Sequence, residues 1–399
     1  MLLSIIIVNY NVSYFLEQCL YSVEKALRSA GLSEEPQAAA EILVFDNHST
    51  DGSRDYLPPK FPRVRFFFNG ENIGFGAANN RALAESAGEV VLFLNPDTIL
   101  PEDLFKAALS FLRDHPRAGA MGFRMVDGAG RYLKESRRGY PSPWVAFCKL
   151  GGLTALFPRS RPFAGYYLGH LPEDQSSPAP ILSGACLFVT RQALERTGGF
   201  DERFFMYAED IDLSHRIGQA GFVNYYIADP PILHFKGEST HKDARYIRQF
   251  YKAMSQFRRK HSGKGVRLAA NRIMDAAIWA RAGIAAAGQL FHRRTGAEGP
   301  MGPAWVTGDP KTASLLRTRL SGMGWALASS PGEASRIIYC EGDDYSFGQI
   351  IASLRDAAKA GKARKGRNAG DRIALIHAAG SSSLVGSPSK AGQGEAYRL

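Results

Sequence analysis

Short apolar runs alternate with helical stretches over about the first 125 residues of the chain. Runs rich in Val, Ile and Phe, each followed by a polar turn, predict buried strands. These strands are expected over residues 3–10, 41–47, 63–69 and 89–97, with helices over residues 15–27 and 76–86. Strands that are apolar on both faces and alternate with helices are typical of a parallel sheet covered by crossover helices. The pattern therefore predicts an α/β fold with a mostly parallel sheet.

The pattern changes beyond residue 125. Residues 126–180 combine Gly, Pro, Arg and aromatic residues, which predicts loops and short helices over one side of the sheet, where a second substrate would be selected. A strand over 180–190 and helices over 191–198 and 207–219 are expected next. From residue 303 onward, the pattern predicts a small second α/β unit, with strands over 303–309, 334–344 and 371–380, a helix over 347–361 and an exposed loop over 359–370.

Length and composition indicate a protein of more than one domain. The chain has 399 residues, 45% of them hydrophobic, so it can bury a large core. We predict a catalytic domain over 1–240, a basic helical segment over 241–298 and a small α/β domain over 299–399. The first residues lack a basic region and a cleavage site, so we interpret them as a buried strand rather than an export signal. The four cysteines form no Cys-x-x-Cys pair, which argues against a zinc site and favours a cytoplasmic location.

The positive charge is concentrated in one segment. Residues 242–294 contain 13 Lys and Arg but only two Asp, a surplus that equals the net charge of +11 for the whole chain. Such a block favours an anionic membrane surface or a nucleic acid, although a solvated basic face is also consistent with it. Apolar residues at helical spacing over 266–291 are interrupted by charges, which predicts an interfacial amphipathic helix rather than a spanning one. A helix packed on the protein's own surface is the alternative.

Polar side chains follow each predicted strand of the first sheet. They are Asn9-Tyr10-Asn11, Asp46-Asn47, Asn69 and Asn95-Pro96-Asp97. Asn and Asp are common in turns after any strand. Ligands of parallel sheets, however, bind at the carboxyl ends of the strands, and four polar strand ends in succession favour a binding site there.

Three carboxylates crowd the start of the predicted helix over 207–219. Glu209, Asp210 and Asp212 lie within four residues. Acids at a helix N-terminus are stabilised by about 0.3–1 kcal/mol each, so a capping role is the simpler interpretation. In combination with Asp97 and His234, however, the cluster supplies ligands for a divalent cation and leaves one carboxylate to take a proton.

Six ordered motifs over residues 1–240 resemble the inverting family-2 glycosyltransferases of the GT-A fold, in particular their rhamnosyltransferase-like branch. The motifs are VNYN, VFDNHSTDGS, NIGFGAANNRA, LNPD, SGACLFVTRQALERTGGFDERFFMYAEDIDLSHRI and HFKGES. The resemblance implies transfer of one sugar, with rhamnose favoured, from a dTDP- or UDP-sugar donor to a hydroxyl of a glycan in cell-surface polysaccharide synthesis. We expect a lipid-linked acceptor and a peripheral location at the inner face of the membrane, where the 242–294 segment contacts anionic lipids.

The resemblance also implies roles for the polar residues of the site. Asp210 matches the catalytic base of the family, and Glu209 is expected to support the acceptor side. Asp97 is expected to bind the Mg²⁺ or Mn²⁺ ion that bridges the diphosphate. Family members often carry Asp-x-Asp where this chain has Asn95-Pro96-Asp97, so His234 is the expected second ligand of the cation.

The donor itself is expected to lie across the strand ends. The residues assigned to it are Tyr10, Asn11, Asp46, Asn72, Gly74, Asn79, Asn95 and Gly184. An aromatic ring such as Tyr10 can stack on a pyrimidine, the carboxylate of Asp46 can accept its N–H, and a glycine such as Gly74 allows close approach. Asp212 is expected instead to orient Arg216, one helical turn further along.

Two other functional classes are weaker interpretations of the same residues. A dinucleotide-dependent oxidoreductase is suggested by the sequence GFGAANN, but Asn79 replaces the third glycine and the motif does not follow the first strand. A nucleic-acid-binding module is suggested by aromatic residues that interleave with the basic ones over 246–257, but their spacing also fits a helix that packs on the catalytic domain. We therefore expect no nucleic acid partner. The chain also lacks the Gln-x-x-Arg-Trp motif of processive synthases, which favours single-residue addition.

Overall fold

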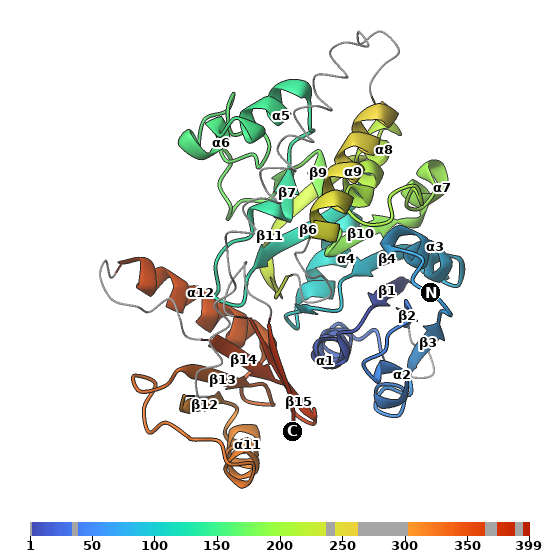
Figure 1. Ribbon diagram of the computed structural model, residues 1–399. Helices are drawn as coiled ribbons and strands as arrows, with labels where there is room; N and C mark the ends of the chain where they lie inside the picture. Colours follow the sequence, from blue (N-terminus) through green and yellow to red (C-terminus); the bar gives the residue numbers. More distant parts are fainter. Residues whose placement is uncertain (1, 34–38, 237–243, 262–301, 364–372, 388–393) are drawn as a thin grey trace.

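The computed structural model describes residues 2–33, 39–236, 244–261, 302–363, 373–387 and 394–399, which form two sheets with their covering helices (Figure 1). The larger sheet has the strand order β3-β2-β1-β4-β10-β6-β11-β5, and β8 pairs with β11 beside this path. Its strands are β1 (Leu3–Asn9), β2 (Ala40–Asp46), β3 (Val64–Phe68), β4 (Val90–Leu94), β5 (Thr98–Ile99), β6 (Ala118–Val126), β8 (Ser177–Pro178), β10 (Cys186–Thr190) and β11 (Val223–His234). The four strands from β3 to β4 are parallel, whereas β10 runs antiparallel to both of its neighbours. The predicted mostly parallel α/β sheet is confirmed.

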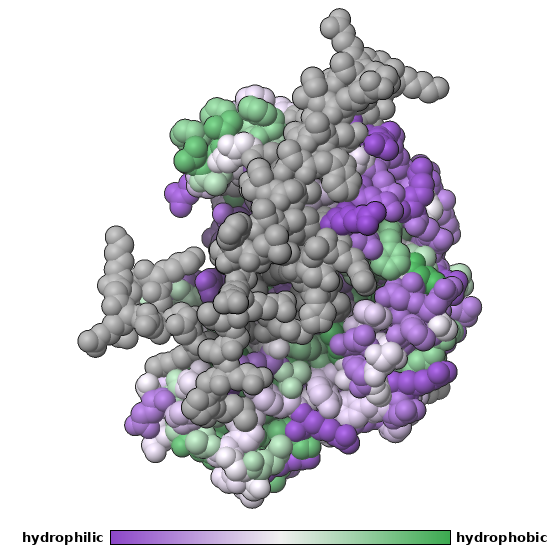
Figure 2. Space-filling view, viewed as in Figure 1, coloured by the Kyte–Doolittle hydropathy of each residue, from purple (hydrophilic) through white to green (hydrophobic). Residues whose placement is uncertain are grey.

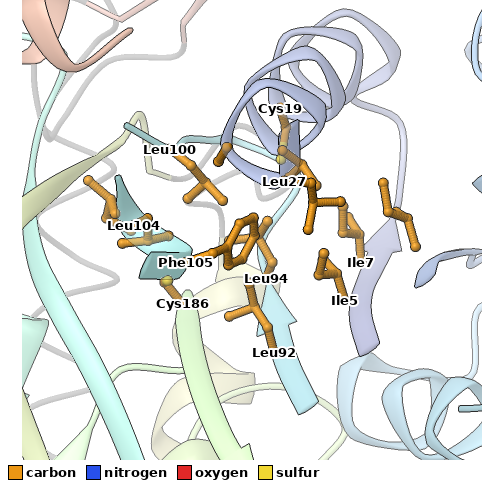
Figure 3. Packing of buried hydrophobic residues seen from close by; sticks show 14 of the residues in the cluster. Ile5, Ile7, Cys19, Leu27, Leu92, Leu94, Leu100, Leu104, Phe105 and Cys186 are labelled. Atoms are coloured by element: carbon orange, nitrogen blue, oxygen red, sulfur yellow. The ribbon is translucent and has the colours of Figure 1, made fainter. Parts of the chain in front are cut away.

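Helices cover both faces of this sheet because its central strands are apolar on both sides. All seven residues of β1 and all five of β4 are buried. Helices α1 (Ser13–Ser29) and α4 (Leu104–Asp114) pack on one face, where Phe105 and Leu27 lie over β1 and β4 (Figure 3). Helices α3 (Phe75–Ala84), α7 (Arg191–Thr197) and α8 (Glu209–Gln219) cover the other face.

The region between β6 and β10 consists of loops and short elements, as its composition predicts. These are the 3₁₀ helix η1 (Lys134–Ser136), β7 (Arg137–Arg138), the short helices α5 (Pro143–Leu150) and α6 (Leu153–Leu156), and β9 (Ile181–Leu182). The prediction of one strand over 180–190 is wrong. The chain bends at residues 183–185, so β9 pairs with β7 in a separate two-stranded sheet while β10 joins the large one. A further one-turn helix, α2 (Ser53–Tyr56), follows β2.

The first part of the basic segment forms helix α9 (Ala244–His261), which packs on the N-terminal unit. Phe257 and Ala253 are buried against Phe204 and Ala208, and the ring of Phe250 lies 5.8 Å from that of Tyr207. The described aromatic residues of this helix therefore follow the packing interpretation of their spacing. The expected amphipathic helix over 266–291 lies outside the described residues. No helix within the described ranges has the length and apolarity needed to cross a membrane.

The C-terminal residues form the second sheet. Its strand order is β12 (Ala304–Gly308), β13 (Arg336–Cys340), β14 (Ile373–His377), β15 (Ser383–Gly386) and β16 (Glu395–Arg398), with the first three strands parallel. Helices α11 (Pro310–Gly322) and α12 (Phe347–Ala363) accompany it. Helix α12 continues into the expected loop over 359–370, because Lys359 to Ala363 include good helix formers, and the remainder of that loop lies outside the described residues.

The two units share a continuous interface centred on α1. An apolar cluster combines Phe15 of α1 and Leu233 of β11 with Phe347 and Ile351 of α12. Beside it, the fully buried carboxylate of Glu17 accepts hydrogen bonds from the Lys60 ammonium, the Tyr56 hydroxyl, the Ser383 hydroxyl and the Ser382 backbone N–H. A buried charge with this many partners ties the C-terminal unit to the catalytic domain.

We expect Glu17→Ala to lower the free energy of unfolding by about 3–5 kcal/mol, because it leaves the Lys60 ammonium without its buried partner. Urea denaturation followed by circular dichroism measures the change. The matched control is Glu195→Ala on α7, where the carboxylate is exposed and little change is expected. Equal stability of the two variants would show that the Glu17 cluster does not stabilise the interface.

Candidate active site

The carboxyl ends of the four parallel strands lie at one edge of the large sheet. Asn9 is paired with Asp46, Asp46 with Phe68, and Ile7 with Leu94. The strands therefore end at the same level, and the polar residues that follow them are brought together. This edge is where a ligand of a parallel sheet binds.

The turns after β1 and β2 hold Asp46 in a fixed position. Its carboxylate is buried and accepts hydrogen bonds from the Asn9 amide at 2.7 Å and from the Ser49 backbone N–H at 2.8 Å. Asn11 has a φ of +56° and accepts a hydrogen bond from the Thr50 backbone N–H at 2.7 Å, so it holds the second turn against the first. Tyr10, which lies between Asn9 and Asn11 in the sequence, is half-buried.

The turn before α3 is tied both to these residues and to the acid-bearing segment. The side-chain Oδ1 of Asn72 accepts hydrogen bonds from the Asn47 side-chain amide at 2.9 Å and from the Gly74 N–H at 3.0 Å. Gly74 has a φ of +89°, and a Cβ there would lie 2.6 Å from the Phe205 carbonyl oxygen. Glycine is therefore required for the close approach of this turn to the segment that precedes α8. Asn79 is buried within α3, where its amide donates to the Phe75 carbonyl oxygen at 2.9 Å, so it stabilises the turn from inside the helix.

Asp210 is anchored at the N-terminus of α8 by two groups. Its Oδ2 accepts hydrogen bonds from Nη2 of Arg138 at 2.7 Å and from the Gly184 backbone N–H at 3.2 Å. A Cβ on Gly184 would lie 3.2 Å from Cβ of Asp210, so this glycine fits closely against the acid. Gly184, expected at the donor, thus also positions the expected base.

Arg138 is a site residue that the sequence analysis did not assign. The pairing of β7 with β9 places Arg138 opposite Ile181, two residues before the turn that contacts Asp210. The only sequence signal was the Arg-Arg pair in SRRGYPSPW, within a segment without periodicity. Pairing of two-residue strands that lie about 40 residues apart in the chain cannot be inferred from a local pattern.

The backbone immediately before the acids is strained. Tyr207 and Ala208 have φ values of +70° and +66°, and neither is a glycine. Such conformations cost about 1–3 kcal/mol each and persist where the surroundings enforce them, often at active sites. Here the packing of Ala208 against α9 and the Phe205 contact to the Gly74 turn hold the segment in place.

Glu209 and Asp210 are adjacent but lie in different environments. Glu209 is buried, and its Oε2 has no hydrogen-bond partner among the described residues. Burial, together with the neighbouring charge of Asp210, raises the pKa of Glu209 to about 8. At neutral pH Glu209 is therefore protonated, and it lies beside the Asp210 carboxylate that is paired with Arg138.

Asp97 and His234 lie side by side at the end of β4 and β11. Nε2 of His234 lies 3.3 Å from Oδ1 of Asp97 and 3.4 Å from the Asn95 amide nitrogen. Nδ1 of His234 is buried without a hydrogen-bond partner in the described part of the chain. A carboxylate and an imidazole are two suitable ligands for Mg²⁺ or Mn²⁺. The described residues contain no group of three or more ligating side chains, so phosphate oxygens and waters would have to complete the coordination.

A single turn connects the end of β4 to the N-terminus of α8. The backbone N–H of Asn95 donates to the Ala185 carbonyl oxygen at 2.9 Å, and the N–H of the adjacent Gly184 donates to Asp210. The end of β4 and the start of α8 therefore lie on either side of residues 183–185.

Asp212 links α8 to α9. It is fully buried, and the predicted contact to Arg216 is confirmed at 2.7 Å. Lys260 and His261 of α9 also contact it, at 2.6 and 2.7 Å. Burial alone would raise the pKa of Asp212, but the hydrogen bonds from these three partners outweigh it and lower the pKa.

A separate cavity of about 500 Å³ lies in the C-terminal unit, at the carboxyl ends of β12, β13 and β14. Its lining mixes the carboxylates of Asp309 and Asp343 with the cations of Lys311 and Arg319. The sequence analysis assigned no chemistry to it, and this mixture of charges does not define a ligand class.

Comparison with known proteins identifies relatives of the catalytic domain. Residues 4–196 match the sequence model of the family described as Glycosyl transferase family 2. The chain is 34% identical over 278 residues to N-acetylglucosaminyl-diphospho-decaprenol L-rhamnosyltransferase of Mycobacterium tuberculosis. The aligned region covers 65% of this chain and 85% of the relative. It is 26% identical over 178 residues to rhamnosyltransferase WbbL of Escherichia coli, which spans 42% of this chain and 63% of the relative. The solved structure of S. aureus TarS has a TM-score of 0.45 and 17% identity, covering 75% of this chain and 46% of TarS, and is too distant to support an argument.

We expect the stability of the protein to fall between about pH 5 and about pH 8 because of Glu209. The folded protein holds a proton on this residue up to a pKa of about 8, whereas the unfolded chain releases it near the ordinary value of 4.5. The stabilisation is therefore fully present below that ordinary value and is lost as the pH rises towards 8. Urea midpoints measured across this range should fall more steeply for the wild type than for Glu209→Gln. Parallel curves would contradict the raised pKa.

Proposed function

Because this chain belongs to glycosyltransferase family 2, we propose that it transfers one sugar from a nucleoside-diphosphate donor to a hydroxyl of a lipid-linked glycan, with inversion at the anomeric carbon. The 34% identical relative is named for L-rhamnosyl transfer and for a decaprenol-linked molecule, and WbbL is also named a rhamnosyltransferase. These names favour rhamnose as the sugar. We assign a dTDP-sugar as its donor, within cell-surface polysaccharide synthesis.

The observation that carries this proposal is the fixed carboxylate of Asp210 at the ligand-binding edge of the sheet. Arg138 and the Gly184 N–H orient it before the acceptor binds. Asp210 then takes the proton of the acceptor hydroxyl while the hydroxyl oxygen bonds to the anomeric carbon. The bond from that carbon to the diphosphate breaks on the opposite side, and its electron pair leaves with the nucleoside diphosphate. One displacement of this kind inverts the configuration.

The donor residues divide into groups that contact the nucleotide and groups that support them. In this proposal Tyr10 stacks on the base, Asp46 accepts its N–H, and Asn11 fixes the turn around both. Asn72 and Gly74 form the turn beside the donor, and Asn79 supports that turn from within α3. Asn95 lies where the diphosphate reaches the end of β4.

We assign the cation to Asp97 and His234. Nε2 of His234 lies 3.3 Å from Oδ1 of Asp97, a separation that two ligands of one cation can have. When bound, Mg²⁺ or Mn²⁺ would neutralise the charge that develops on the leaving diphosphate. The nearby Asn95 amide helps to orient the imidazole.

We also propose that the protein acts in the cytoplasm, at the inner face of the membrane, through the basic segment over 242–294. In the described part of this segment, Lys260 points inward to Asp201 and Asp212, whereas Arg248, Lys252 and Arg259 are exposed. The exposed cations of α9, together with residues 262–294 outside the described ranges, are the proposed contact to anionic lipid headgroups.

We expect Asp210→Asn to lower kcat for sugar transfer by about 100- to 10,000-fold, the usual contribution of a general base, with little change in KM for the donor. Release of dTDP from dTDP-rhamnose in the presence of Mg²⁺ and a polyprenyl-diphosphate acceptor measures the rate. Asp114→Asn, at an exposed carboxylate on α4, is the matched control and should keep the wild-type rate. An active Asp210→Asn enzyme would exclude Asp210 as the base.

We expect Asp97→Ala to remove the effect of the cation on donor binding. Calorimetry with dTDP, UDP and GDP, each with Mg²⁺ or with a chelator, should show at least about tenfold tighter binding of one nucleotide to the wild type when the metal is present. The variant should bind with the same affinity in both conditions. A metal effect that persists in Asp97→Ala would place the cation elsewhere.

A further inference from the structure

Helices α5 and α6 carry an unusually exposed apolar surface. It consists of Trp144, Phe147, Leu156 and Phe157, which are 50%, 57%, 72% and 50% exposed, and we call these four residues the hairpin patch. In the described part of the chain, five large hydrophobic side chains are at least 50% exposed, and the patch supplies four of them. Figure 2 shows α5 and α6 as a hydrophobic area at one end of the molecule.

The patch is held outward by a defined local structure. Nε1 of Trp144 donates to the Pro162 carbonyl oxygen at 2.9 Å, and the Thr154 hydroxyl donates to the Phe163 carbonyl oxygen at 2.8 Å. The ring of Phe163 lies 6.2 Å from that of Trp144 and 5.4 Å from that of Phe157. The two helices and the chain after them thus form one small packed unit. The four side chains of the patch remain at least half exposed on it.

The charged residues of the segment that carries the patch have a single sign. Between Glu135 and Glu173 the chain has five Lys and Arg but no Asp or Glu, although Arg137 is buried and Arg138 is paired with Asp210. Arg159 and Arg161 are exposed, and the Lys149 ammonium lies 3.8 Å from the centre of the Tyr167 ring at the edge of the hairpin. Apolar side chains with a tryptophan, flanked only by cations, are typical of a surface that inserts into the interface of an anionic bilayer.

We propose that the hairpin patch inserts into the headgroup region of an anionic membrane. This surface is distinct from the 242–294 segment, which contributes charge but whose described part packs Phe257 and Lys260 inward. The patch begins six residues after Arg138, the partner of Asp210. If the proposed function holds, insertion of the patch brings a membrane-embedded acceptor to the side of the sheet where Asp210 lies.

Co-sedimentation of the full chain with vesicles tests the patch directly. We expect the wild type to bind vesicles of phosphatidylcholine and phosphatidylglycerol, and Phe147→Ser/Leu156→Ser to bind at least about tenfold more weakly, because two large apolar side chains no longer enter the bilayer. Leu315→Ser is the matched control, since this leucine of α11 is 67% exposed outside the patch, and it should bind as the wild type does. Arg159→Gln/Arg161→Gln should weaken binding only when phosphatidylglycerol is present.

Tryptophan fluorescence gives a second readout that does not depend on affinity. In a Trp279→Phe background, brominated phosphatidylcholine should quench the emission, and Trp144→Phe should remove most of this quenching because Trp305 and Trp325 lie in the C-terminal unit, outside the patch. Circular dichroism should show that all variants are folded, since the substituted side chains are at least half exposed.

The outcomes separate this proposal from the proposed function. Vesicle binding by Phe147→Ser/Leu156→Ser that equals that of the wild type would overturn the role of the patch. If light scattering also showed a changed oligomeric state for this variant, the patch would be a self-association surface instead. The patch variant should retain the wild-type rate on a water-soluble acceptor analogue and lose rate only on an acceptor in vesicles. A wild type that binds vesicles through the patch but transfers no sugar would refute the transferase proposal alone.

Discussion

The hydrogen bond from the Gly184 N–H to Asp210 is the contact on which the arrangement of the site depends. It joins the turn at residues 183–185 to the first turn of α8, while the neighbouring Ala185 carbonyl oxygen accepts the Asn95 N–H at the end of β4. One short turn therefore sets the position of the acid relative to the sheet edge that would hold a donor. The tight fit at Gly184 and the strained backbone at residues 207–208 both follow from this requirement. Local strain is tolerated because the rest of the domain is well packed around it.

The fold and the polar edge of the sheet were predictable because both follow from local patterns. Continuous apolar runs identified the strands, and each polar strand end lies where parallel strands place it. Arg138 was not predictable, because its position depends on the pairing of two-residue strands far apart in the sequence. The bend within residues 180–190 was missed for a related reason, since a buried glycine turn between apolar residues has the same composition as a strand. Lys260 turns inward because it pairs with the buried Asp212. A count of charges along the sequence does not show this pairing.

The C-terminal unit is part of the same folded body rather than an appendage. Glu17 lies on a crossover helix of the catalytic sheet, yet it is buried against Ser383 and Ser382 of the second sheet. The helix that covers β1 therefore supports both units. Any movement of the C-terminal unit would displace α1, which directly follows the turn that carries Tyr10 and Asn11.

The most direct test of the central claim is a crystal structure of the full chain with dTDP and Mn²⁺. We expect the base to contact Tyr10 and Asp46, and the cation to lie about 2.2 Å from both Asp97 and His234, with the diphosphate completing its coordination. The open side of the diphosphate should then face Asp210. A nucleotide bound instead in the cavity of about 500 Å³ beside Lys311 and Arg319 would contradict the assignment and place the ligand chemistry in the C-terminal unit.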